Sequence, residues 1–204
     1  MPINKKDFTD YLLKVEEISK IGLKYSKDPY AIDNYTKLSE LTNSFLKDEF
    51  SISLKGLNFF TRDIYPTPSV SVRTVIFSKD RQSVLLVKER ADGYWSLPGG
   101  WTELGLSPSA SAIKEVKEEA GKIVKLTHLV GVFDRYKNIQ TTNVPEYIIV
   151  FEGEIVKDLK EFCFEILDVQ YFPLSKLPTW SIKNNPKQME EILKAAYNKE
   201  TIFD

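Results

Sequence analysis

Apolar side chains recur at helical spacing twice within the first fifty residues. From Phe8 to Leu23 they lie three or four positions apart with lysine and glutamate between them, which predicts an amphipathic helix over residues 8–25. Asp28 followed by Pro29 is typical of a helix start, and the same period then continues to about residue 46. Two helices of this size cannot bury both apolar stripes against each other. We therefore expect them to pack on the main domain or on a partner subunit.

A change of composition separates these helices from the rest of the chain. Residues 47–68 combine Phe, Gly and Pro and end in Tyr65-Pro66-Thr67-Pro68, which is poor helix-forming sequence. We place a domain boundary at Pro66. Residues 1–65 then form an N-terminal helical domain for dimerisation or docking, and residues 66–204 form the main domain.

The main domain mixes strand and helix patterns without a regular β-α-β alternation, which predicts an α+β fold. Strands are expected over residues 69–77, 83–87, 131–133, 147–155 and 169–172. Helices are expected over residues 109–120 and 186–197.

Composition narrows the class of protein but names no function. The chain is 42% apolar and 28% charged with a formal net charge of −1, so no overall field directs it to nucleic acid or to an anionic membrane. No apolar run approaches the ~20 residues that span a bilayer. The single cysteine, Cys163, excludes an internal disulfide and lies in an apolar run that predicts a buried thiol. A cytoplasmic location is expected.

The central predicted helix carries three glutamates that could bind a metal ion. Ser107-Pro108 and Gly121 mark the start and end of this helix. Glu115, Glu118 and Glu119 occupy one arc, where they repel one another, so local helix propensity does not favour them. Carboxylates with substrate phosphate form a typical Mg²⁺ shell. On the helix alone, a solvated face with a Lys114–Glu118 ion pair is the simpler interpretation.

The residues before this helix favour the metal site. Leu97-Pro98-Gly99-Gly100-Trp101 lets backbone groups approach a ligand where side chains would obstruct. Together with the helix, this segment resembles the Nudix box: Gly, five residues, Glu, seven residues, then Arg-Glu-apolar-x-Glu-Glu-x-Gly-apolar. Gly100, Glu115, Val116, Glu118, Glu119 and Gly121 fall in register.

Three positions depart from that pattern. Leu106 replaces the first glutamate, Lys114 replaces the arginine and Lys122 replaces the last apolar residue. Loss of the acid at 106 together with the arginine at 114 fits the hypothesis of a lost structural ion pair.

The resemblance implies an α/β/α sandwich around a mixed sheet, and it implies roles for the residues in register. Glu118 and Glu119 would bind Mg²⁺, with Mn²⁺ as an alternative. Glu115 would be a metal ligand or a base, the Gly99 carbonyl a further ligand, and Gly100 part of the substrate-binding bend. Together these groups would direct water onto a diphosphate.

Several residues outside the Nudix box are candidate site residues, and each also has a simpler structural explanation. Nudix enzymes often supply a base or ligand before a late strand; here Glu165 is the candidate, with Asp168 second, and a surface acid is an equal alternative for each. Arg73 could neutralise substrate phosphate, although a strand arginine more often lies on a solvated face. Phe133, Tyr136 and Tyr147 could stack on a base, although core packing is the simpler expectation for Phe133 and Tyr147.

The N-terminal helices are also similar to a known extension. The segment Gly22-Leu23-Lys24-Tyr25-Ser26-Lys27-Asp28-Pro29-Tyr30 resembles the helical extension of Nudix hydrolases that act on X-linked nucleoside diphosphates. This implies a homodimer that hydrolyses a nucleoside diphosphate joined to a group X, with CDP-choline first and ADP-ribose second as substrate. A nucleotide-sensing regulator and an RNA-end hydrolase are the alternatives; nucleic acid is not the expected partner because the chain has no basic recognition helix.

Overall fold

The chain divides into two compact units, residues 1–68 and 69–204. Our computed structural model describes residues 5–50, 67–103, 105–135, 145–159 and 161–203, so most of the segment predicted to join the units lies outside the described residues. Within these ranges, no helix is both long and apolar enough to cross a bilayer.

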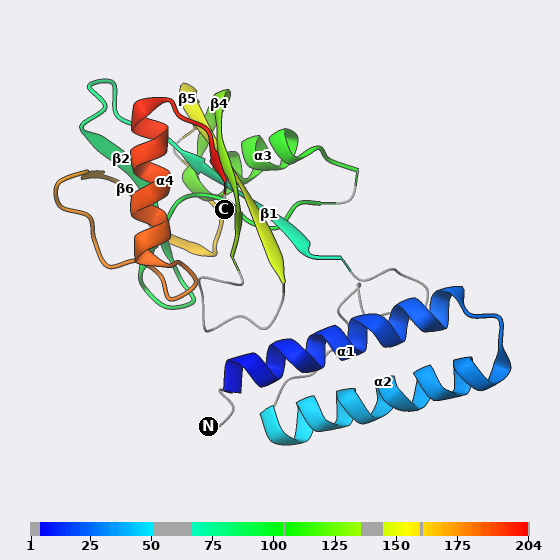
Figure 1. Cartoon of the computed structure of the whole chain (residues 1–204). Helices are drawn as coiled ribbons and strands as arrows, with labels where there is room; N and C mark the ends of the chain where they lie inside the picture. Colours follow the sequence, from blue (N-terminus) through cyan, green and yellow to red (C-terminus); the bar gives the residue numbers. More distant parts are fainter. Residues whose placement is uncertain (1–4, 51–66, 104, 136–144, 160, 204) are drawn as a thin grey trace. The chain divides into compact units, whose positions relative to one another are not determined.

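The first unit is a helical hairpin built from α1 (Lys5–Tyr25) and α2 (Pro29–Phe50), which confirms the two predicted helices (Figure 1). Asp28 begins α2 as the sequence indicated, because its carboxylate accepts a hydrogen bond from the Tyr30 N–H. Glu16 of α1 is fully buried and accepts hydrogen bonds from Ser39 and Asn43 of α2. A buried carboxylate with partners on the facing helix fixes how the two helices align.

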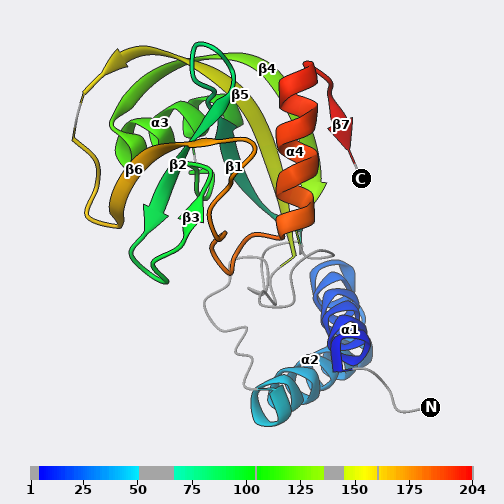
Figure 2. The same cartoon turned by 90° about the vertical axis from the view of Figure 1, so that its left-hand side faces the viewer.

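Two small sheets form the middle of the second unit. One has the strand order β1-β5-β4-β7, with β1 parallel to β5 and β4 antiparallel to β5, and the other has the order β3-β2-β6. The strands are β1 (Ser69–Val75), β2 (Ser83–Glu89), β3 (Trp95–Ser96), β4 (Lys122–Asp134), β5 (Glu146–Asp158), β6 (Ile166–Pro173) and β7 (Ile202–Phe203). Helices α3 (Pro108–Ala120) and α4 (Pro186–Asn198) cover opposite sides of this layer (Figures 1 and 2). The expected α/β/α sandwich is confirmed.

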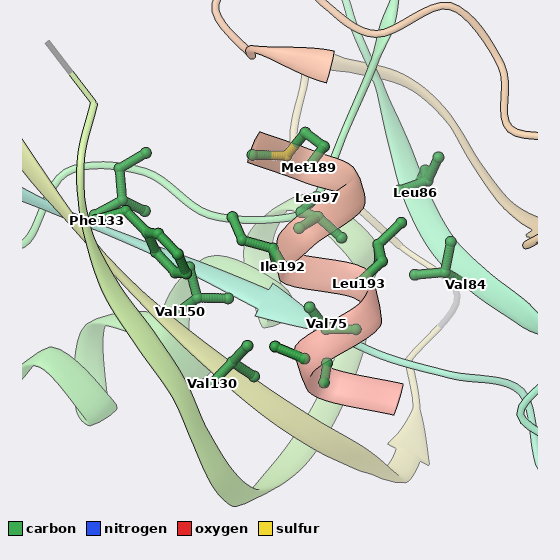
Figure 3. Packing of buried hydrophobic residues seen from close by; sticks show 13 residues of the cluster. Val75, Val84, Leu86, Leu97, Val130, Phe133, Val150, Met189, Ile192 and Leu193 are labelled. Atoms are coloured by element: carbon green, nitrogen blue, oxygen red, sulfur yellow. The ribbon is translucent and has the colours of Figure 1, made fainter. Parts of the chain in front are cut away.

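Each helix packs against its own apolar core. On the α4 side, Met189, Ile192 and Leu193 form one cluster with Val75 and Val150 of the sheet (Figure 3). A second cluster on the α3 side joins Val116 and Ala120 to Ile76, which directly follows β1, and to residues of β2, β4 and β6. Successive strand residues point to opposite faces, so β2 supplies alternate residues to both cores.

Several local expectations were wrong. The sequence predicted only residues 131–133 of β4, whose pairing with β5 shifts register three times, so its side chains do not alternate cleanly. Tyr147 is 45% exposed because the neighbouring Ile148 takes the core-facing position. Cys163 is only partly buried, and Phe164 beside it is 78% exposed; both lie in the segment before β6.

Arg81 fastens the end of α4 to the sheet. Its guanidinium lies 2.6 Å from Glu152 Oε1 of β5 and donates hydrogen bonds to the carbonyls of Ala196 and Tyr197 in the last turn of α4. Lys199 also pairs with the buried Glu152, at 2.7 Å. These contacts compensate a buried carboxylate and satisfy carbonyls that the helix leaves without partners.

We expect Arg81→Met to lower the free energy of unfolding by about 1–3 kcal/mol, because Glu152 loses one of its two cations and α4 loses donors at its C-terminus. Lys79→Met, at a neighbouring exposed lysine, should change it by less than about 0.5 kcal/mol. Urea denaturation of both variants measures the difference, and equal midpoints would contradict the role given to Arg81.

Candidate active site

The bend at Gly99 and Gly100 lies directly along β1. The N–H groups of Val72 and Thr74 donate to the carbonyls of Gly100 and Pro98, both at 2.9 Å. Gly99 has φ of +148°, and a Cβ at this position would lie 2.1 Å from the Val72 carbonyl oxygen. Only glycine permits this approach, so the bend is fixed on the edge of β1 by main-chain contacts.

The central helix starts and ends where the sequence indicated. Ser107 accepts a hydrogen bond from the Ala110 N–H at the N-terminus of α3, and Gly121 adopts the left-handed conformation with φ of 62° at its C-terminus. Ala112, Val116 and Ala120 face the core as the helical period predicts, whereas Ile113 is 37% exposed. The helix therefore turns its acidic arc partly toward the glycine bend.

Two of the three glutamates reach the bend. Glu119 is 8% exposed, and its Oε2 accepts a hydrogen bond from the Gly99 N–H at 2.7 Å. The Glu115 carboxylate packs against Gly100, since a Cβ on that glycine would lie 2.9 Å from the carboxyl carbon. The carboxylates of Glu115 and Glu119 therefore lie beside the backbone of the glycine bend.

The third glutamate, Glu118, is paired with a lysine. Its Oε2 lies 2.9 Å from Lys114 Nζ, the i,i+4 ion pair considered from the sequence, and its side chain is 47% exposed. Lys114 Nζ also lies 2.7 Å from Glu103 Oε1. The hypothesis that Leu106 and Lys114 mark a lost ion pair stays a prediction, and Lys114 has an acidic partner, Glu103, three residues before Leu106.

Burial changes the acidity of this group of residues. Desolvation raises the pKa of the Glu119 carboxyl to about 7, although the Gly99 N–H and the Arg73 charge act in the opposite direction. Desolvation also raises the pKa of Glu115. Proton uptake at Glu119 is thus favoured in the folded protein when no cation is present.

Arg73 is the internal counter-charge of the site. It is 4% exposed, and burial lowers its pKa while the charges of Glu119 and Glu146 raise it. The expectation of a solvated face was wrong because β1 has β5 on one side and the glycine-bend segment on the other, and α4 covers the face of the strand that carries Val75. A buried arginine among carboxylates offsets part of their repulsion.

A second group of charges, not singled out from the sequence, lies beside Glu119. Lys183 pairs with the buried Glu89 at 2.5 Å, and both affect the pKa of Glu119. Arg135 pairs with Glu146 and also donates to the Lys183 carbonyl. These residues come from separate strand ends and a loop, so no spacing along the chain indicates that they lie together.

The other sequence candidates are placed differently. Glu165 is exposed in the turn before β6, and this turn is attached to α3 by a hydrogen bond from the Cys163 N–H to the Glu118 carbonyl. Asp168 accepts hydrogen bonds from its neighbours Val169 and Gln170, so its oxygens are locally engaged. Phe133 is 3% exposed within the α4-side core, which removes support for base stacking. Tyr136 lies outside the described residues.

The donor set suits a hard cation, but the structure does not hold it preassembled. Among the residues described, no three acidic, histidine or cysteine side chains are close enough together to hold a metal ion. Glu118 is engaged by Lys114, and Glu119 by the Gly99 N–H. Carboxylate and carbonyl oxygens are the ligands that Mg²⁺ and Mn²⁺ take in proteins, so a cation fits here once these side chains turn toward it.

Comparison with known proteins agrees with this architecture. The NUDIX domain family model matches residues 67–196. The Bacillus subtilis (strain 168) protein named "Putative ADP-ribose pyrophosphatase YjhB" is 33% identical over 201 residues, which cover 94% of each chain. The ADP-ribose pyrophosphatase of Methanocaldococcus jannaschii is 32% identical over 123 residues, or 56% of this chain and 68% of that protein.

Solved structures extend the similarity to both units. A UDP-X diphosphatase is 28% identical, covers 99% of this chain and 100% of its own, and superposes with a TM-score of 0.63. An ADP-ribose pyrophosphatase from Streptococcus suis is 30% identical over 68% of this chain and 100% of its own, with a TM-score of 0.59. The family model, which spans more than half of the sequence, and the nearly full-length relative show that this chain belongs to the Nudix hydrolase family.

Proposed function

We propose that the chain hydrolyses the diphosphate bond of a nucleoside diphosphate joined to a group X, giving a nucleoside monophosphate and phosphorylated X. The observation that carries this proposal is the meeting of Glu115 and Glu119 with the glycine bend in a chain whose box keeps all three helical glutamates. The sequence favours CDP-choline as the substrate, whereas two of the relatives are named ADP-ribose pyrophosphatases, so we place ADP-ribose first.

Mg²⁺, or Mn²⁺ in its place, would be held by Glu118 and Glu119, by the Gly99 carbonyl and by Glu115. Such an ion neutralises diphosphate oxygens and lowers the pKa of a bound water. Glu119 would bind such an ion as the deprotonated carboxylate, and its Oε2 now accepts the hydrogen bond from the Gly99 N–H.

The remaining candidates balance charge, form the substrate-binding bend or accept a proton. Arg73 holds its positive charge behind Glu119, where it offsets the carboxylates while substrate is absent. Gly100 lets the Glu115 carboxylate lie against the backbone of the bend, where the substrate is proposed to bind. Glu115 is the nearer candidate base because it lies at the bend, and Glu165 is the second because its turn is bonded to α3.

The helical hairpin is proposed to form the subunit contact of a homodimer. Tyr11, Ile18 and Tyr25 recur every seven residues along α1 and are each more than half exposed. A stripe with this period is typical of helices that pack at a shallow angle against a partner helix.

Activity is tested by Mg²⁺-dependent phosphate release, with a coupled phosphatase, from ADP-ribose, CDP-choline, UDP-sugars and nucleoside triphosphates. We expect Glu118→Gln to lower kcat/KM at least about 100-fold, since an amide is a weaker ligand than a carboxylate. Glu191→Gln, at an exposed glutamate of α4, is the matched control and should retain activity. Tight binding of one compound without turnover of any would support a sensor instead.

The metal-free protein should lose stability as pH rises. The Glu119 pKa of about 7 lies above its ordinary value of 4.5, so the stabilising neutral form is complete below about pH 4.5 and is lost as pH rises through about 7. We expect the free energy of unfolding in EDTA to fall by on the order of 2 kcal/mol between about pH 5 and 8. Glu119→Gln should flatten this dependence; urea titrations with the same slope in both proteins would exclude Glu119 as its origin.

A further inference from the structure

Lys114 lies between two carboxylates that come from different parts of the chain. Glu118 is its i,i+4 neighbour on α3, at 2.9 Å, whereas Glu103 comes from the segment between the glycine bend and α3, at 2.7 Å. The ammonium group of Lys114 therefore joins that segment to the helix. All three side chains are partly exposed, so the contacts are free to rearrange.

The position of Glu103 compensates for the departure at residue 106. The Nudix box pattern has a glutamate where this chain has Leu106, whose side chain is exposed and which ionises nothing. The Leu106 N–H donates to the Glu103 carbonyl at 3.1 Å, so residues 103 and 106 belong to one turn. An acid three residues earlier thus reaches the same basic residue of the helix.

We propose that Glu103 takes the place of the missing box glutamate as the partner of Lys114, and that it thereby keeps Glu118 available to a divalent cation. The inference rests on the proposed function, in which Glu118 is a metal ligand. Lys114 contacts Glu118 through Oε2, at 2.9 Å. The ammonium group and a cation would compete for the Glu118 carboxylate, and Glu103 draws the ammonium group away.

The proposal fixes the sign of two substitutions. Without Glu103, Lys114 has Glu118 as its remaining carboxylate partner among these contacts, so cation binding becomes weaker. Without Lys114, Glu118 is free and the acidic arc lacks its neutralising neighbour, so cation binding becomes equal or tighter. Glu103 is thus a positioning residue that acts through Lys114.

The test measures Mn²⁺ binding to the full chain from the electron paramagnetic resonance signal of free Mn²⁺, which requires no turnover. E103Q should raise the Kd about two- to fivefold, as expected for exposed ion pairs, and K114M should leave it equal or lower it. The double variant E103Q/K114M should match K114M. E191Q, which removes the same charge from α4, should bind like the wild type.

Rescue separates this role from a general change of charge. Adding L106E to E103Q should restore the wild-type Kd, because the acid returns to the same turn. Unchanged binding by E103Q, failure of L106E to restore it, or a loss that persists in E103Q/K114M would each overturn the inference. If the wild type bound Mn²⁺ no more tightly than E118Q, the proposed metal site itself would fail, and this inference with it.

Discussion

The contact between Gly99 and the Val72 carbonyl sets the geometry of everything around the candidate site. A Cβ at residue 99 would lie 2.1 Å from that oxygen, so the bend can rest on β1 only because it lacks a side chain. This contact presents the Gly99 N–H to Glu119 and the Gly100 backbone to Glu115. The helix and the bend are thereby brought to one point although twenty residues separate Gly99 from Glu119.

Bringing acids to that point carries an electrostatic cost that the surrounding residues reduce. Glu119 is buried and shifted toward its neutral form, Arg73 supplies a charge from β1, and Lys114 pairs with the more exposed Glu118. Burial, an internal arginine and a surface lysine thus each offset part of the repulsion among the three glutamates.

The sequence predicted the parts of the fold that depend on local signals. The boundaries of α3 followed from Ser107, Pro108 and Gly121, because capping is decided by a few neighbouring residues. The length of β4 did not follow, since its irregular pairing with β5 breaks the alternation by which strands are recognised. The burial of Arg73 could not be inferred either, because it depends on β5, the glycine bend and α4, which are distant from Arg73 in the sequence.

Within the candidate site, too, only the features that depend on neighbouring residues could be predicted. Spacing identified the glutamates of one helical turn, but the partners Glu89, Lys183 and Glu103 come from other elements and have no sequence period in common with them. Leu106 was interpreted as the loss of a glutamate because the Nudix box pattern is compared with the sequence one position at a time. The acid three residues earlier, Glu103, belongs to the same turn and lies 2.7 Å from Lys114 Nζ.

The way in which the glycine bend is attached has a consequence for divergence among relatives. Val72, Thr74 and Thr102 hold it through main-chain N–H groups that donate to carbonyls, and none of these bonds depends on the identity of a side chain. Substitutions along β1 that keep the strand extended can therefore accumulate without displacing the backbone of the glycine bend. Residues of the two cores can then be substituted while the backbone of the bend keeps its position.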